Sequence, residues 1–436
     1  MSFSKSQLII IGSVLVIVLF FILIFLGVIP GLRSDLGSKT KLVMWGVYDS
    51  ADDFAGSFSR LATVLPNVSI SYVQKDPLTY ETELVNALAL GSAPDIVMVH
   101  NSWLHKHSNK LSPAPATTFD LKAVRDLFPA VVEQDFVSGG NVYALPLYID
   151  TLALYYNQDL FNAANLSFPP STWDEFIADV DILKNVDRAG KINRAAAAIG
   201  GSADSVNHAP DLIYLLMLQS GARMVDANYT AAVFADYSKD GIRPGSSALE
   251  FYTQFGNSRS PHYTWNDSLH YSLDSFSEGA VAMIFDYSFI RETITSKNPF
   301  LKFSIAKIPQ LSDAPIPVNF ADYWGLSVLN RSPYRALAWQ AVAFLTTDLD
   351  SVNGYLSASS RPPALRSLLS ACSRDTNLSP FCAQTLTART WPRPDQSKVD
   401  DIFSNAVKSV LNGKLSILNA LSEAQDNVSL LLTKNK

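Results

Sequence analysis

Few residues in this chain have the type and spacing that metal binding or catalysis requires. His105 and His107 are two apart, so on a strand they would share one face and could hold a metal ion. No Cys, His or carboxylate stands at a useful spacing beside them, and their polar surroundings (LHKHSNK) favour a solvated loop. Tyr155 and Tyr156 could offer phenolates to iron, but their apolar neighbours favour one inward-facing and one outward-facing ring of a strand. The sequence therefore predicts no metal and no cofactor.

Sequence signatures of catalysis are absent. The chain contains no G-x-S-x-G, H-E-x-x-H, G-x-x-x-x-G-K-[ST] or G-x-G-x-x-G. We therefore expect no catalytic residue and no turnover. An exported glycan-active enzyme stays open as an alternative, because the carboxylates of glycosidases carry no reliable local pattern. Asp49 and Asp286 would be the candidates for that chemistry.

The composition is that of a folded chain without affinity for nucleic acid. The chain has 436 residues, with 34 Lys and Arg against 40 Asp and Glu, which gives a net charge of −6. Apolar types make up 48% and charged types only 17%, the opposite of a disordered chain. A mildly acidic chain without a long basic run lacks the positive face that nucleic acid requires. At roughly 150 residues per unit, the length favours two or three domains.

The N-terminal segment predicts a membrane anchor. Residues 8–29 carry no charge, and Ser13 is their only polar side chain. At about 1.5 Å per residue, this run spans roughly 33 Å, the thickness of the hydrocarbon core of a bilayer. A secretory signal has a shorter apolar region and a small-residue cleavage site, whereas this run ends in GVIPG. We expect a single-pass protein of the cell membrane with its C-terminal part on the extracytoplasmic side; a long, cleaved signal peptide is the alternative.

The elements after this segment alternate between strands and helices. Strand patterns cover residues 41–46, 67–73, 96–99, 280–285, 302–308 and 324–329, and helix patterns cover residues 50–65, 80–90, 332–346 and 399–410. Thr172 and Glu175 form a T-x-x-E capping box ahead of another amphipathic helix, and Gly91 and Gly413 end two of the helices. The alternation predicts an α/β fold with mostly parallel sheets.

The chain has two cysteines, Cys372 and Cys382, which are ten residues apart. A disulfide that closes this short loop would fit an oxidising, extracytoplasmic compartment. Two free, buried thiols are the alternative. No cysteine follows the apolar run, so we expect no lipid-modified anchor cysteine.

A series of short segments follows in a fixed order along the chain. They are the strand that ends in Trp45, Tyr80-x-x-x-Leu84, ALGSAPDI at 89–96, YALP at 143–146, LYYNQDLF at 154–161, PPSTWDE at 169–175, FSEGAVAM at 276–283 and ADYWGLSV at 321–328. Taken together, they resemble the extracellular solute-binding proteins of family 1, the maltose-binding-like receptors of ABC importers. The resemblance covers roughly residues 40 to 432, and it rests on the order of the motifs because each motif alone is weak.

The resemblance implies a fold and a function. The fold is α/β, a two-lobed periplasmic-binding-protein fold of type II with a ligand cleft between the lobes, here preceded by one N-terminal transmembrane helix. The expected parts are an anchor at 1–30, a linker at 31–39, lobe I at 40–150 and 315–350, and lobe II at 151–314 and 351–436. Such a protein would capture a mono- or oligosaccharide for the permease subunits of an ABC importer. The retained anchor departs from most relatives, so a ligand-binding sensor ectodomain is a further alternative.

Candidate ligand-binding residues follow the carboxyl ends of the strands, where the two lobes would face each other. They are Trp45, Tyr48, Asp49, Asn101, Trp103, Asp150, Asp286, Tyr287, Asp322, Tyr323, Trp324 and Arg361. Aromatic faces beside carboxylates and amides suit a neutral sugar, which presents apolar C–H faces and hydroxyl groups. Core packing is the alternative for each aromatic ring. We expect Trp45 of lobe I and Tyr287 of lobe II to meet on one ligand when the lobes close.

Overall fold

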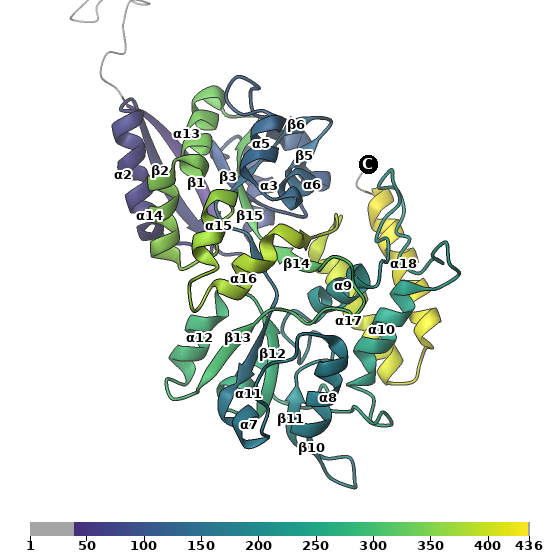
Figure 1. Cartoon of the computed structure of the whole chain (residues 1–436). Helices are drawn as coiled ribbons and strands as arrows, with labels where there is room; N and C mark the ends of the chain where they lie inside the picture. The colour runs from purple at the N-terminus through teal and green to yellow at the C-terminus, as the bar shows by residue number, and fades with distance from the viewer. Residues whose placement is uncertain (1–38, 435–436) are drawn as a thin grey trace, which may run out of the picture.

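The computed structural model describes residues 39–434, and within them the chain folds into two α/β lobes (Figure 1). Lobe I lies at the top of that view and lobe II at the bottom, with β14 between them. The predicted anchor at residues 8–29 lies outside the described residues, as does the linker up to residue 38. Within residues 39–434, no helix is both long enough and apolar enough to cross a membrane.

Lobe I is built on a sheet with the strand order β2-β1-β3-β15-β4, and β7 also pairs with β15. Its strands are β1 (Thr40–Val47), β2 (Val68–Lys75), β3 (Ile96–His100), β4 (Leu111–Ser112), β7 (Leu145–Pro146) and β15 (Trp324–Leu329). Strand β3 (IVMVH) is buried along its whole length because it lies inside the sheet, between β1 and β15. Its unbroken apolar run is typical of a strand that is covered on both faces.

The helices of lobe I follow the predicted pattern closely. The remaining elements of the lobe are η1 (Asp52–Phe54), α2 (Ala55–Val64), α3 (Tyr80–Leu90), α4 (Leu104–His107), η2 (Ser108–Lys110), α5 (Leu121–Leu127), α6 (Ala130–Phe136), the hairpin β5 (Val137–Ser138) and β6 (Asn141–Val142), α13 (Arg335–Thr347), α14 (Leu349–Ser359) and α15 (Arg366–Cys372). Helix α3 ends at Gly91, whose φ of 73° lies in the left-handed region that glycine adopts without strain.

Lobe II is built on a second sheet with the strand order β10-β11-β12-β9-β13. Its strands are β9 (Ala153–Asn157), β10 (Asn185–Val186), β11 (Ile192–Ala197), β12 (Val281–Asp286) and β13 (Phe303–Ala306). The predicted difference between neighbouring tyrosines holds on β9, where Tyr155 is fully buried and Tyr156 is half-buried. The ring of Tyr155 lies inside the core, whereas that of Tyr156 is partly exposed and packs at the edge of the core against Phe161.

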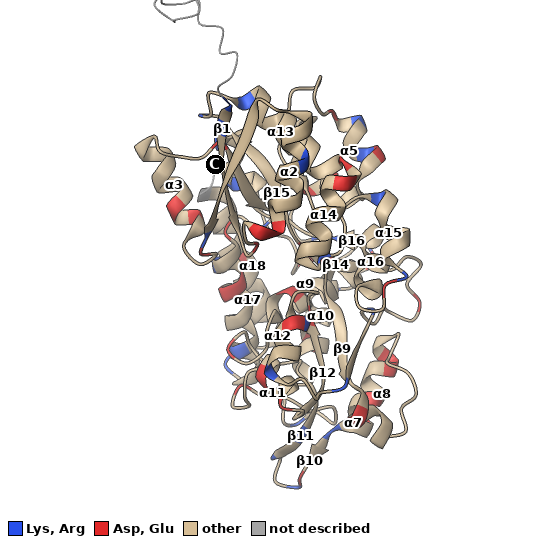
Figure 2. Cartoon of the chain, turned by 90° about the vertical axis from the view of Figure 1, so that its left-hand side faces the viewer, with Lys and Arg blue, Asp and Glu red and all other residues tan. Residues whose placement is uncertain are grey.

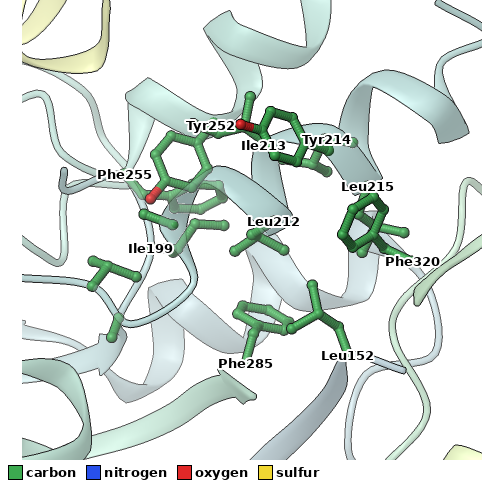
Figure 3. Packing of buried hydrophobic residues seen from close by; sticks show 14 of the residues in the cluster. Leu152, Ile199, Leu212, Ile213, Tyr214, Leu215, Tyr252, Phe255, Phe285 and Phe320 are labelled. Carbon is green, nitrogen blue, oxygen red and sulfur yellow. The ribbon is translucent and has the colours of Figure 1, made fainter. Parts of the chain in front are cut away.

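The helices of lobe II surround a core that Figure 3 shows from close by. They are α7 (Gln158–Ala163), α8 (Trp173–Leu183), α9 (Ala209–Gln219), α10 (Pro244–Gln254), α11 (Ser272–Ser277), α12 (Ile290–Lys297), α16 (Ser379–Gln384), η3 (Thr385–Thr387), α17 (Gln396–Leu411) and α18 (Ile417–Lys434). Leu212, Tyr214 and Leu215 of α9 are fully or almost fully buried in this core. The predicted capping box at the start of α8 is present, with both of its hydrogen bonds between Thr172 and Glu175.

Three short strands join the lobes, and they explain why the sheets are mixed rather than mostly parallel. They are β8 (Asp150–Thr151), β14 (Asn319–Asp322) and β16 (Ala388–Arg389), which form their own sheet in the order β16-β14-β8. The chain enters lobe II from β8 and immediately forms β9, which is antiparallel to β12. It enters lobe I from β14 and immediately forms β15, which is antiparallel to β3. A strand that enters from the other lobe starts where its neighbours end, so it must run against them.

The boundary between the lobes in the last part of the chain lies later than the predicted residue 350. Val352 and Tyr355 of α14, and Ala364 and Leu365 after it, are buried in the core of lobe I. The ring of Tyr355 stacks on Phe54 at a centroid distance of 5.0 Å, which ties α14 to the first helical turn of the lobe. The chain returns to lobe II only at α16, which a disulfide between Cys372 and Cys382 joins to α15 (Cα–Cα 5.9 Å).

Candidate ligand site between the lobes

A cavity of about 270 Å³ lies between the two lobes, and both contribute to its wall. Lobe I supplies the loop after β3 together with α4 and α6, through Asn101, His105, Gln134 and Asp135. Lobe II supplies the C-terminal end of α9 and the loop after it, through Leu218, Ala222, Arg223, Met224, Val225 and Tyr229. The connection after β16 closes the wall with Thr390, Trp391 and Pro392. The volume lies just below the roughly 300–1,000 Å³ typical of small-molecule sites.

Asp135 organises the lobe I wall of this cavity. Its carboxylate accepts hydrogen bonds from the hydroxyls of Tyr323 (2.7 Å) and Thr390 and from the amide of Asn101 (3.4 Å). Burial nevertheless outweighs these hydrogen bonds and raises the pKa of Asp135 to about 7. Two polar atoms of the cavity residues have no partner in the described part of the chain, the Oδ1 of Asn101 and the Nε1–H of Trp391. The residues of the cavity wall therefore include one acceptor and one donor without partners, and both atoms are buried in this conformation.

Aromatic rings form a second surface at the start of β15. Trp324 is half-buried, and its ring meets His100 and Trp103 edge-on at 5.1 Å and Tyr48 at 6.2 Å. Tyr48 is 56% exposed and has a φ of 63°, a left-handed conformation that is uncommon for a tyrosine. Behind them, Trp103 stacks on Tyr80 and belongs to the core of lobe I. Of the four lobe I rings Tyr48, Tyr80, Trp103 and Trp324, those of Tyr48 and Trp324 are accessible to a ligand.

A buried ion pair stands behind this aromatic surface. The guanidinium of Arg361 donates twice to Asp49 Oδ1, at 3.0 and 2.9 Å, and lies over the ring of Tyr148 at 4.3 Å. The hydroxyl of Tyr355 donates to the other oxygen of Asp49 at 3.0 Å. Because Asp49 is 3% exposed and its oxygens already have partners, its role is to hold Arg361 in place.

His208 is the centre of the charged cluster on the lobe II side. It precedes α9 in a left-handed conformation (φ 53°), with its Nδ1 at 3.3 Å from Asp211 and its Nε2 at 3.6 Å from Asp286. Burial alone would lower the pKa of His208, but Asp286, Asp211 and Asp322 outweigh it and raise that pKa to about 9. The imidazolium is therefore the stable form at neutral pH.

Two hinge carboxylates lie next to this cluster. Asp322 of β14 pairs with the Nε2 of His100 at 3.0 Å, and although burial opposes it, the nearby cations hold its pKa below the usual range. Asp150 of β8 accepts from the backbone and hydroxyl of Ser288 at 2.9 and 2.6 Å, while burial raises its pKa to about 7. The register of the hinge sheet places Asp150 directly opposite Asp322. Charge thus extends from lobe I through the hinge to His208.

The structure separates the predicted site residues into two groups. Tyr48, Asp322, Trp324 and Arg361 face the region between the lobes or support it, and Asn101 lines the cavity. Trp103, Tyr287 and Tyr323 are at most 8% exposed, so they pack inside the lobes instead of facing a ligand. Trp45 is half-buried under the ammonium of Lys75, which lies 3.9 Å from the ring centroid. The expected meeting of Trp45 with Tyr287 is not found in this conformation.

Of the residues in the cavity wall, the sequence prediction of ligand-binding residues included only Asn101, and it also missed Phe289 and His208 outside the cavity. Phe289 is 47% exposed and lies two positions after Tyr287, against which its ring stacks at 6.2 Å. His208 precedes a proline-containing first turn, and that signal of a helix start could have identified it. No pattern in the sequence around Trp391 indicates a binding residue, because only the fold places it in the same cavity wall as Asn101.

The two histidines considered as metal ligands serve different purposes. His107 is buried with its Nε2 2.6 Å from Glu81, so the expected solvated loop is wrong for this residue. His105 is exposed, and its ring lies 4.5 Å from that of Tyr229, so lobe I touches lobe II here. Among residues 39–434, no group of three or more His, Cys, Asp or Glu side chains is placed to hold a metal ion.

Comparison with known proteins agrees with this architecture. Residues 52–348 match the family described as bacterial extracellular solute-binding protein. A protein of Brucella abortus, whose name gives it only as a binding protein, is 24% identical over 372 residues, which are 81% of this chain and 83% of that protein. The solved structure of the cyclic alpha-maltosyl-1,6-maltose binding protein from Arthrobacter globiformis is similar, with a TM-score of 0.75 at 20% identity, over 91% of this chain and 100% of that one. The glycerophosphocholine complex of UgpB from Mycobacterium tuberculosis has a TM-score of 0.70 at 17% identity, over 91% and 99%.

Proposed function

The chain belongs to the bacterial extracellular solute-binding protein family, and from this premise we propose that it captures a carbohydrate between its lobes for import by an ABC-type permease. Members of this family bind solutes outside the cytoplasm and are not enzymes, so the glycan-active enzyme considered from the sequence is set aside. The cavity that both lobes build carries the proposal, because a ligand there would hold the lobes together.

The polar atoms of the cavity suit hydroxyl groups. A sugar hydroxyl donates and accepts, so hydroxyls of one ring would satisfy both the Oδ1 of Asn101 and the Nε1–H of Trp391 once a movement of the lobes exposes these buried atoms. A polyamine would leave the indole donor without an acceptor. Leu218 and Met224, in the lobe II wall, offer apolar surface to the C–H faces of a sugar ring.

A longer saccharide would reach the aromatic surface as well. His208 precedes α9, and Leu218 lies near the other end of this helix at the cavity, roughly 15 Å away along the helix axis. Phe289 of lobe II offers an accessible ring 6.3 Å from that of His208, and Tyr48 and Trp324 of lobe I offer two more. We therefore propose an oligosaccharide that extends from the cavity toward these rings between the lobes.

A substitution that separates binding from folding tests the proposal. Trp391→Phe keeps an aromatic ring but removes an N–H that has no partner in the described chain, so sugar affinity should fall about tenfold, and the smaller ring in the lobe II core should lower the melting temperature. Trp173→Phe is the matched control, because its Nε1–H donates to Gln219 at 2.6 Å inside lobe II. The control shrinks an equally buried indole and should also lower the melting temperature, but it should keep the affinity.

A thermal-shift panel of maltose, maltotriose, glycerophosphocholine and spermidine should be run on the wild type and both variants. At a ligand concentration a hundredfold above its dissociation constant, the stabilisation is about 2.7 kcal/mol, which is readily measured. Stabilisation by glycerophosphocholine or spermidine alone would reject the carbohydrate. Equal sugar affinity in Trp391→Phe and wild type would reject the cavity as the binding site.

We also propose that residues 8–29 stay in the mature protein and tether it to the membrane. The support is the length and apolar character of the run and its poor cleavage site. Mass spectrometry of the N-terminus of the purified protein tests this directly. A mature N-terminus between Pro30 and Lys41 would mean that the segment is a signal peptide.

Import and sensing differ in their partners rather than in the site. We propose import, because the family is that of ABC solute-binding proteins. Uptake of the labelled sugar should fall in cells that lack the protein and recover with the wild type but not with Trp391→Phe. Normal uptake without the protein would favour the sensor ectodomain.

A further inference from the structure

The wall of the cavity between the lobes contains an arginine without a partner. Arg223 lies in the loop after α9, and among the described residues of the wall it is the one lysine or arginine. It is exposed, and its guanidinium has no hydrogen bond and no ion pair with the residues that the structure describes. A cation that lines a ligand cavity and is accessible to solvent can pair with an anionic group of the ligand.

Two other arginines of the region between the lobes have carboxylate partners within the fold. Arg361 donates twice to the Oδ1 of Asp49, at 3.0 and 2.9 Å. Arg393 is 1% exposed, and its Nη1 lies 3.3 Å from the Oδ1 of Asp211. The fold balances both of these charges itself, whereas the charge of Arg223 is left to solvent or to a ligand.

The backbone that carries Arg223 is held at the cavity from both lobes. Ala222 and Met224, on either side of it, are buried in the core of lobe II. Further along the same loop, the ring of Tyr229 lies 4.5 Å from that of His105 in lobe I. The loop therefore reaches from one lobe to the other, and Arg223 belongs to the region that a ligand would occupy between them.

The other charged groups near Arg223 do not neutralise it. Asp135 belongs to the opposite wall, and burial raises its pKa to about 7, so at neutral pH it is partly protonated. Burial also lowers the pKa of His105, so its imidazole is neutral. The carboxylate of Asp226, three residues after Arg223, accepts from the backbone and the hydroxyl of Thr230, both at 2.5 Å, within its own loop.

An arginine in this position is suited to an acid group. Its guanidinium is planar and presents N–H groups that match two oxygens of a carboxylate or a phosphate. Closure of the lobes around a ligand removes water, and an ion pair is stronger where less water screens it. An uncharged sugar would instead leave the guanidinium without an opposite charge in the closed cavity.

We propose that the saccharide captured between the lobes carries an acid group, and that Arg223 binds this group and sets the preference for it. The acid group is a carboxylate, as in a uronic acid, or a phosphate ester, because both present the oxygens that a guanidinium binds. This ligand class rests on the proposed capture of a carbohydrate. It differs from the neutral sugar that the aromatic residues at the strand ends favour, because Arg223 is not among those residues.

Titration calorimetry on the purified protein tests this assignment with two matched pairs, digalacturonate with galactobiose and phosphorylated maltose with maltose. In at least one pair, the acidic sugar should bind about tenfold more tightly than its neutral counterpart, and that pair identifies the acid group as carboxylate or phosphate. Arg223→Gln should remove the difference and keep the melting temperature, because the side chain has no partner in the described chain to lose. Arg259→Gln changes an exposed arginine of the same lobe outside the cavity wall, and this matched control should keep the difference.

The outcomes distinguish this assignment from the proposed function. Equal affinity of the acidic and the neutral sugar in both pairs would overturn the acidic ligand and leave the capture of a carbohydrate in place. The same holds if Arg223→Gln keeps the preference of the wild type for the acidic sugar. Binding of none of the four sugars would overturn both.

Discussion

The charged cluster around His208 should make the stability of lobe II depend on pH in a predictable direction. The imidazole lies between Asp211 at 3.3 Å and Asp286 at 3.6 Å, and it is no more than 27% exposed. Replacement by glutamine keeps a polar side chain of similar size and removes the titrating group. The difference in the free energy of unfolding between wild type and His208→Gln therefore reports on this one residue.

The size of the effect follows from the pKa. Burial opposes the charge, but the carboxylates raise the pKa from 6.5 to about 9, a difference that corresponds to about 3 kcal/mol. Because the folded chain holds this proton more tightly than the unfolded chain, the stabilisation is complete below pH 6.5. It is lost as the pH rises through 9. The wild type should therefore exceed the variant by about 3 kcal/mol more at pH 6 than at pH 9.5.

Urea unfolding, followed by tryptophan fluorescence at pH 6, 7.5 and 9.5, measures this difference. Asp286→Asn should reduce the pH dependence by removing the carboxylate with the strongest effect on His208. His262, which lies beside Asp181 on the surface of lobe II, is a matched control. The free energy of unfolding of His262→Gln should depend on pH as that of the wild type does. A difference between wild type and His208→Gln that stays constant from pH 6 to 9.5 would refute the reasoning.

Three further perturbations test other parts of the structure. Phe289→Ala should weaken sugar binding by roughly 2 kcal/mol in calorimetry with little change in melting temperature, because the ring is 47% exposed; early melting with normal affinity would contradict this. Replacing Cys372 and Cys382 by serine should cost about 3 kcal/mol in urea unfolding, as expected for so short a loop, and an unchanged midpoint would count against that. Gly46→Ala should lower the melting temperature, since a Cβ there would lie 2.6 Å from the hydroxyl of Tyr72, and Gly46→Ala with Tyr72→Phe should recover part of the loss.

Most of the fold could be predicted from the sequence, because the sequence patterns that indicate its helices and strands are local. The capping box of α8 and the glycine that ends α3 each specify the backbone within one turn, and both are found where they were predicted. The apolar run of β3 likewise marks a strand inside a sheet. The prediction of mostly parallel sheets missed the antiparallel strands β9 and β15, because alternation of strands and helices says nothing about which lobe a strand enters from.

The order of charged residues along the sequence did not predict where charged side chains cluster in the fold. Figure 2 shows basic and acidic residues interspersed over the face turned to the viewer, without a continuous band of one sign. The hinge sheet creates the charged cluster between the lobes. It brings Asp150 and Asp322 opposite each other although they are 172 positions apart in the sequence (322 − 150). Local sequence could identify each carboxylate as a strand-end residue but could not pair them.

What the sequence determined by itself was the α/β architecture, the kind of family and the positions where strands end. Whether an aromatic ring at a strand end faces a ligand or the core was decided by the tertiary structure. Tyr287 and Phe289 are two residues apart, yet the hydroxyl of the first is bound to Asp211 inside lobe II and the ring of the second is half exposed. Burial depends on what packs against a residue. The neighbours of Tyr287, like those of Asn101 and Trp391, come from distant parts of the chain that only folding brings together.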